Sequence, residues 1–166
     1  MPSLCILGID PGTLRMGYAV LTVGDDDPAP VAWGVLAASG RLPLGQRLYT
    51  LHTQLLEIME RHHPTHAAAE EPFVSANVRT ALAIGQAQGL ALLAAAQKGV
   101  PLAGYSPRQV KLAVTGNGAA TKDQVQQAVA FHLRLSSLPT PTDASDALAV
   151  ALCHWQALRE EGMLLP

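Results

Sequence analysis

The sequence contains few charged and aromatic residues and only two cysteines. Charged residues make up 14% of the chain and aromatic residues 4%, against 49% hydrophobic residues. Cys5 and Cys153 lie in separate apolar stretches, which excludes a disulfide framework and predicts reduced core thiols. No apolar run reaches the roughly 18 residues of a membrane span, and the opening residues lack a secretion signal. We therefore expect a cytoplasmic protein with its own hydrophobic core.

The net charge of -2 argues weakly against nucleic-acid binding, but the charges are unevenly distributed. Positions 72–122 contain no Asp or Glu and five cations: Arg79, Lys98, Arg108, Lys111 and Lys122. A net charge can hide a basic face that binds DNA or RNA. Ordinary solvated surface explains such a stretch equally well, so composition alone leaves both interpretations open.

Hydrophobic periodicity and turn residues predict a single α/β domain over residues 1–166. The expected strands are 4–10, 16–23, 31–38, 67–71 and 100–105, and the expected helices are 46–61, 76–97, 107–114, 121–133 and 143–160. Ser106-Pro107 has the form of a helix start, and Thr121 with Gln124 fits a capping box. Three strands followed by alternating helices and strands indicate a mixed sheet flanked by helices.

Several acidic residues lie where a functional site could form, although each also has an ordinary structural explanation. Asp10 ends a buried strand at a turn, where an Asx-turn is common. Glu70 and Glu71 end a short strand, and only one of them can face a given side of the sheet. Asp143 and Asp146 share a face at a helix start, where capping and the helix dipole favour acids in any case.

Taken as a set, these acids predict a site for hard divalent cations. Mg²⁺ typically binds a few carboxylates together with substrate phosphate, and two ions about 3.5–4 Å apart can promote phosphodiester cleavage. Close carboxylates repel one another without such cations. No Walker loop or Ser-His-Asp set competes. His62, His63 and His66 lack a cysteine or carboxylate spaced for zinc, so we expect them at the surface near a helix end.

Several short segments of the chain resemble, in order, those of the RuvC family of Holliday-junction resolvases. They are 8–13 with 17–18, 69–73 with Asn77, 85–89, 107–111, 121–125 and 143–149. The first segment alone would be weak, because sugar-kinase and actin-like ATPases open with a similar Asp-x-Gly-Thr string. The whole set covers nearly the full chain and is highly specific.

The resemblance implies a ribonuclease H-like fold and an endonuclease that resolves four-way DNA junctions by paired symmetric nicks in recombination and repair. It assigns catalysis by two Mg²⁺ ions, for which Mn²⁺ substitutes, to Asp10, Glu70, Asp143 and Asp146. It thereby selects Glu70 over Glu71, which the strand pattern alone leaves undecided. It further implies a homodimer and a branch-migration motor of the RuvA and RuvB type as partner.

The resemblance also points to residues that contact DNA. Lys111 and Lys122 match positions near the scissile phosphate, and Phe73 matches an aromatic placed against bases at the junction centre. A core position after a strand would explain Phe73 as well. Arg108 lies three residues before Lys111 on the same predicted helix face, so we expect it to contact phosphates too. The chain departs from the family at Glu71, where relatives often have an uncharged residue.

Ala81, Gly85 and Gly89 recur every four residues on one predicted helix and permit close helix approach, either within the chain or between two copies. Three rival functions remain. The first is a ribonuclease H-like nuclease that acts on RNA. The second is an actin-like ATPase or kinase, for which the chain is short and lacks a further phosphate loop. The third is a junction-binding scaffold without activity, against which the intact set of acids argues.

Overall fold

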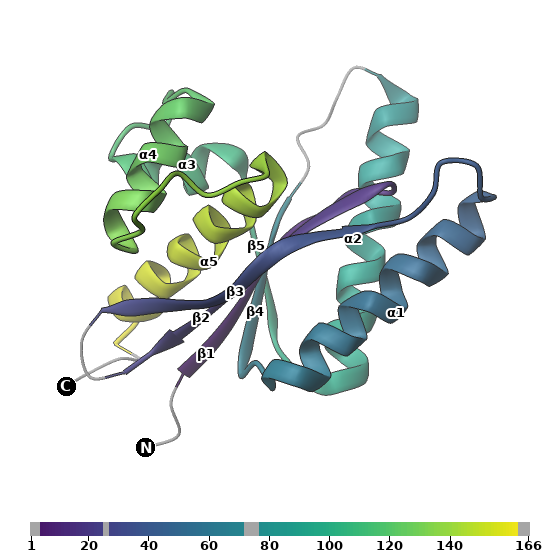
Figure 1. The fold of residues 1–166 in the computed structure, drawn as a ribbon, viewed down its shortest axis with the longest axis horizontal. Helices are drawn as coiled ribbons and strands as arrows, with labels where there is room; N and C mark the ends of the chain where they lie inside the picture. Colours follow the sequence, from purple (N-terminus) through teal and green to yellow (C-terminus); the bar gives the residue numbers. More distant parts are fainter. Residues whose placement is uncertain (1–3, 25–26, 72–76, 163–166) are drawn as a thin grey trace.

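The computed structural model describes residues 4–24, 27–71 and 77–162, which form one sheet with helices on both faces (Figure 1). The strands are β1 (Leu4–Asp10), β2 (Arg15–Val23), β3 (Pro28–Ala37), β4 (His66–Glu70) and β5 (Leu102–Tyr105). The helices are α1 (Leu44–His62), α2 (Val78–Lys98), α3 (Pro107–Thr115), α4 (Lys122–His132) and α5 (Thr142–Glu160). Each of these elements was expected from the sequence, with ends that differ by a few residues.

The sheet has the strand order β3-β2-β1-β4-β5 and is mixed. The first three strands pair antiparallel as a meander, whereas β4 pairs parallel with β1 and β5 pairs parallel with β4. Parallel neighbours need a crossover connection, and α1 and α2 supply these crossovers. The predicted class of a mixed sheet flanked by helices is confirmed.

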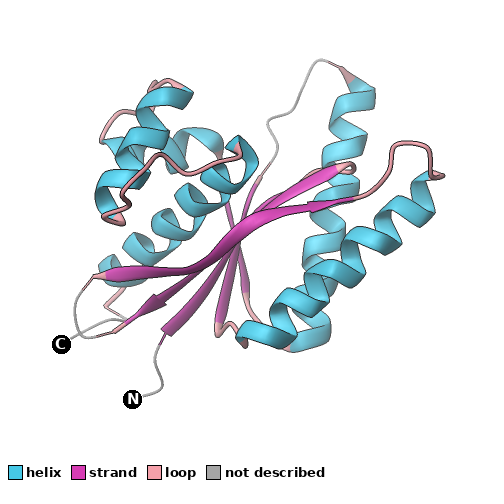
Figure 2. Ribbon diagram, viewed as in Figure 1, coloured by secondary structure: helices cyan, strands magenta, loops and turns pink. Residues whose placement is uncertain are grey.

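Helices cover both faces of the sheet (Figure 2), and the alternating side chains of the strands divide the core into two layers. On one face, Ile6 and Ala68 pack with α3, α4 and α5. On the other face, Leu7 and Ile9 pack with α1 and α2. The apolar runs of β1 and β4 reflect this burial on both faces of the central strands.

Two glycines allow α5 to approach the sheet closely. A Cβ atom on Gly8 would lie 2.2 Å from the carbonyl oxygen of Ala147, and one on Gly17 would lie 1.9 Å from that of Asp143. Any other residue at either position would push the helix away from β1 and β2. The glycines of the first sequence segment therefore set the distance between Asp10 and the start of α5.

The helix starts that the sequence predicted are present. Ser106 and Thr121 both form capping boxes, at α3 and α4 respectively. Both cysteines are buried and free, as expected. Among the described residues, one helix, α2, is long and apolar enough to cross a membrane by length and composition alone, which is weak evidence because core helices of soluble proteins pass the same test.

Candidate active site

Asp10 and Glu70 end two neighbouring parallel strands and face the same side of the sheet. Ile9 of β1 pairs with Ala69 of β4, so the residue that follows each one lies at the same sheet edge. Side chains alternate along a strand, and Ile6 and Ala68 face α5. Asp10 and Glu70 follow them at even spacing and therefore also face α5. Both carboxyls are partly buried.

Asp143 and Asp146 reach the same place from the first turns of α5. The backbone of Asp143 lies directly against Gly17, which pairs with Asp10 in the sheet. The residue at the helix N-cap is Pro141, and no side chain caps this helix. Side-chain capping therefore accounts for neither aspartate, and of the two ordinary explanations only the helix dipole applies, to Asp143 in the first turn.

Electrostatic coupling shows that the structure brings these acids together. Burial, followed by the charges of Asp146, Glu70 and Asp143, raises the pKa of Asp10 from 3.8 to about 8. Burial and the charge of Asp146 also raise the pKa of Glu70. Burial is the main reason that the pKa of Asp146 is raised, with a smaller contribution from Asp143. The cluster is a concentration of negative charge that favours binding of a cation.

Glu71 points to the opposite face of the sheet. A Cβ atom on Gly104 of β5 would overlap the Glu71 carboxyl group. Gly104 pairs with Ala69, whose side chain packs on the α1 and α2 side. Glu71 is therefore separated from Asp10 by the sheet itself. Of the two neighbouring glutamates, only Glu70 lies with the other acids.

Two of the expected DNA-contacting cations lie beside the acids. The Lys122 ammonium is 3.7 Å from the Asp146 carboxylate. Its positive charge also offsets part of the rise in the pKa of Asp10 and Glu70. The charge of Lys111 likewise offsets part of the rise in the pKa of Glu70. Arg108 is exposed, with its side chain against Gly118 in the loop between α3 and α4. Phe73 lies outside the described residues.

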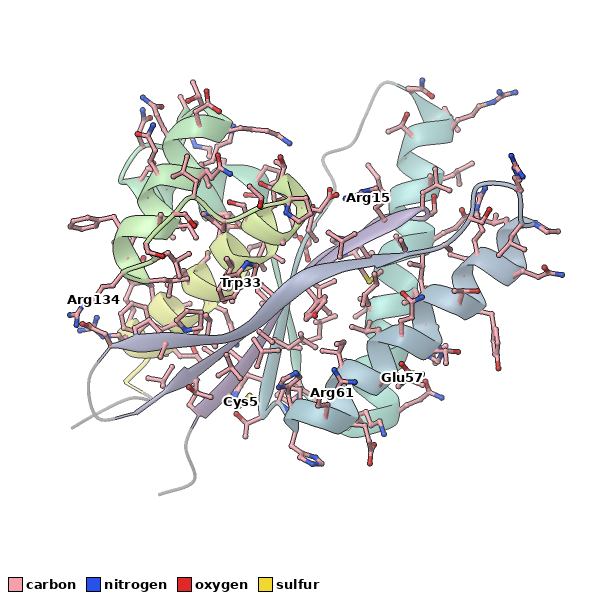
Figure 3. The ribbon with its side chains drawn as sticks, viewed as in Figure 1. Cys5, Arg15, Trp33, Glu57, Arg61 and Arg134 are labelled. Atoms are coloured by element: carbon pink, nitrogen blue, oxygen red, sulfur yellow. The ribbon has the colours of Figure 1, made fainter. Side chains whose placement is uncertain are left out.

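Sequence reasoning missed Arg15 at the start of β2. Its Nε donates to Oδ2 of Asp143 at 2.9 Å, and Figure 3 shows Arg15 at the end of the sheet away from Cys5. Position 15 has the same parity as Gly17, so the side chain faces α5. The hairpin register would have revealed this proximity, because Asp10 pairs with Gly17.

The oxygen donors of this cluster fit a hard divalent cation. Asp10, Glu70, Asp143 and Asp146 offer only carboxylate oxygens, the ligand type that Mg²⁺ and Mn²⁺ prefer. Within ranges 4–24, 27–71 and 77–162, no group of three or more His, Cys, Asp or Glu side chains is arranged to hold an ion as it stands. Asp143 turns to Arg15 and Asp146 to Lys122 instead. To bind an ion together, these acids would have to leave those two ion pairs.

A cavity of about 350 Å³ lies between the turn after β1 and the first turns of α2. It is lined by Gly12, Thr13, Arg79, Thr80, Ala83 and Ile84. The hydroxyl groups and the guanidinium of this lining are groups that commonly contact nucleic-acid phosphates. The cavity therefore offers polar groups close to the turn that follows Asp10, although α2 packs on the sheet face opposite to α5.

The sequence is similar over most of its length to proteins of one family. The family model described as crossover junction endodeoxyribonuclease RuvC matches residues 6–154. A protein of that description from Roseiflexus sp. is 48% identical over 157 residues, 95% of this chain and 94% of the relative. One from Dehalococcoides mccartyi is 44% identical over 149 residues, which covers 90% of both chains.

Solved structures of similar fold include nucleases that act on DNA junctions. The Thermus thermophilus RuvC in complex with Holliday junction substrate matches with a TM-score of 0.89 and 35% identity, covering 95% of this chain and 96% of the other. The yeast mitochondrial Holliday junction resolvase Ydc2 matches with a TM-score of 0.64 and 18% identity, covering 94% and 80% respectively. At that identity, the second likeness concerns the fold alone.

Proposed function

Because the chain belongs to the RuvC family of crossover junction endodeoxyribonucleases, we propose that it resolves Holliday junctions with the four carboxylates at the edge of its sheet. The chain is a nuclease, a metal-dependent hydrolase of DNA recombination and repair. The observation that supports this site best is the convergence of Asp10, Glu70 and Asp146, all with raised pKa, beside Lys122. We assign the metal ligands to these acids together with Asp143.

Two Mg²⁺ ions, or Mn²⁺ in their place, would supply a water-derived nucleophile and stabilise the leaving oxygen of the phosphodiester. The protein's own groups orient the substrate. Asp10 and Glu70 are fixed by paired strands, and Asp146 is fixed by a helix packed on those strands. Such rigid support suits chemistry that needs reacting groups in one geometry.

The cations beside the acids hold the DNA strand and steady its charge. Lys122 and Lys111 lie near enough to the cluster to act on its pKa values, so a phosphate bound at the acids lies within their reach as well. Thr13 and Arg79, which line a cavity between the turn after β1 and the start of α2, are further candidate phosphate contacts in this proposal. Arg108 on α3 and Phe73 complete the DNA surface in this proposal.

A second copy of the chain covers α2 in this proposal, since two symmetric cuts need two equivalent sites. The helix exposes Val78, Leu82, Leu92 and Leu93, which is unusual for large apolar side chains on one helix. A Cβ atom on Gly85 or Gly89 would meet no atom within 4 Å. Packing within the described part of the chain therefore does not explain these two glycines, whereas a helix from a partner copy would.

The same family membership supports two wider assignments. A branch-migration motor of the RuvA and RuvB type is the partner that would deliver the four-way junction, and the cytoplasm is the compartment in which both would meet chromosomal DNA. Residues 1–166 act as one domain in this proposal, since one sheet carries Asp10 and Glu70 and the helix packed on that sheet carries Asp143 and Asp146.

The test is to replace each acid with its amide and to measure cleavage and binding separately. Asp10→Asn, Glu70→Gln, Asp143→Asn and Asp146→Asn should each abolish Mg²⁺-dependent cleavage of a synthetic four-way junction. Junction affinity should not fall, because phosphate contacts elsewhere supply most of it. Full activity in any one variant would remove that residue from the site.

A further inference from the structure

Arg15 is the cation that binds the acid cluster most directly. Its guanidinium lies 2.9 Å from the carboxylate of Asp143, closer than the 3.7 Å between Lys122 and Asp146. The side chains of the pair are 55% and 35% exposed, so either partner can turn away without unfolding the chain. Asp143 is therefore held by a group that is free to exchange it for another anion.

The position of this ion pair conflicts with metal binding. A carboxylate oxygen that accepts a charged hydrogen bond is not available as an ion ligand, and a guanidinium nearby repels a divalent cation. Arg15 and Asp143 lie on neighbouring elements, β2 and α5, which contact one another extensively. Rotation of the side chains, rather than movement of the backbone, therefore suffices to separate them.

We propose that Arg15 is a positioning residue that competes with the divalent ion for Asp143 and, once displaced, binds a phosphate of the junction strand. This inference rests on the proposed function, because it takes Asp143 as a metal ligand. The planar guanidinium suits a phosphate as well as it suits a carboxylate. A DNA phosphate that binds Arg15 thus releases Asp143 for the metal ion. By thermodynamic reciprocity, a metal ion bound to Asp143 releases Arg15 and so raises the affinity for DNA.

One consequence concerns the ion alone. Without DNA, the ion must displace Arg15, so Arg15→Gln should bind Mg²⁺ more tightly than the unaltered chain. Exposed ion pairs contribute little, which sets the expected gain at about two- to fivefold in affinity. Isothermal calorimetry with Mg²⁺, and with Mn²⁺ as second probe, measures it directly. An unchanged or weaker affinity in Arg15→Gln, with an unaltered melting temperature, would overturn the proposal.

A second consequence concerns DNA in the presence of EDTA. Asp143→Ala releases Arg15, so this variant should bind a four-way junction more tightly, and the gain should shrink when Arg15→Gln is added. Asp146→Ala is the matched control, because it also removes one acid of the cluster but leaves the Arg15 pair intact. The gain in junction affinity from Asp146→Ala should be the same in the unaltered chain and in Arg15→Gln. Equal gains from Asp143→Ala in both backgrounds would contradict the exchange.

The calorimetric series also separates this proposal from the function on which it rests. Asp143→Ala should lose Mg²⁺ affinity. If it binds Mg²⁺ as tightly as the unaltered chain, Asp143 is not a ligand; the role of Arg15 is then wrong, and the proposed metal site loses Asp143 but keeps its other three acids. If Asp143→Ala loses affinity while Arg15→Gln shows no gain, the metal site stands and only the role of Arg15 is wrong.

Discussion

Replacing Asp10 with asparagine should make the metal-free protein more stable. The folded state raises the pKa of this carboxyl from 3.8 to about 8, mainly through burial and then through its acidic neighbours. The folded state therefore binds the proton more tightly than the unfolded state does. Stability is lost as pH rises from about 4 to 8, because the unfolded chain gives up the proton first.

The magnitude follows from the size of the shift. One pKa unit corresponds to about 1.4 kcal/mol, and pH 7 lies about three units above the ordinary pKa, which gives an upper bound of about 4 kcal/mol. Side-chain relaxation reduces this figure, so we expect Asp10→Asn to raise the unfolding free energy by about 2–4 kcal/mol at pH 7. In a chain of this length, that corresponds to a rise in Tm of about 4–16 °C.

Thermal and urea unfolding in EDTA, at pH 5 and at pH 8, is the assay. The advantage of Asp10→Asn should be small at pH 5 and large at pH 8, because the amide stays neutral throughout. Asp123→Asn is the matched control: this exposed acid in the first turn of α4 should show no such gain. Saturating Mg²⁺ should stabilise the unaltered chain preferentially. Equal or lower stability of Asp10→Asn at pH 8 would refute the electrostatic reasoning.

Three further predictions concern cleavage, DNA binding and assembly. Losing a group that only supports a metal ligand typically costs roughly 10–100-fold in activity, so Glu70→Gln, which alters a ligand itself, should reduce junction cleavage by more than that. Glu71→Gln, on the opposite face of the sheet, should retain most activity. Lys111→Ala and Lys122→Ala should each shallow the slope of log affinity against log salt by about 0.7–0.9 and slow single-turnover cleavage beyond the binding loss. Leu82→Glu, at a side chain that is 61% exposed, should convert a dimer into monomers in sedimentation experiments without loss of fold.

Each of these predictions has an outcome that contradicts it. Loss of activity in Glu71→Gln but not in Glu70→Gln would mean that the family register is displaced by one residue. Unchanged slopes and rates in both lysine variants would identify those lysines as ordinary solvated surface. A dimer that survives Leu82→Glu would place the interface away from the exposed face of α2.

Local signals predicted most of the fold. The buried runs of β1 and β4, the capping boxes at Ser106 and Thr121, and the stripe of α1 depend on neighbouring residues, which a sequence displays. Strand ends were less accurate: β3 begins at Pro28 rather than Val31, because its pairing with β2 extends the strand beyond its apolar stretch.

Side-chain pairing across elements was the part that sequence could not supply. The Arg15–Asp143 pair joins residues 128 positions apart, and only the sheet register and the glycine contact with α5 bring them together. Likewise, His66 is half-buried rather than on the surface, with its ring centroid 5.8 Å from that of the buried His154. The choice of Glu70 over Glu71 needed the family resemblance at first, and the position of Glu71 against Gly104 now supplies a physical reason.

The most direct test of the central claim is to incubate the unaltered chain with three labelled substrates: a synthetic four-way junction, a linear duplex and an RNA–DNA hybrid. Each is tested with Mg²⁺ and with EDTA, and product ends are mapped on denaturing gels. The account predicts Mg²⁺-dependent nicks at symmetric positions in two strands of the junction, with the duplex and the hybrid left intact. Cleavage of the hybrid in preference to the junction, or junction binding without cleavage in Mg²⁺, would contradict it.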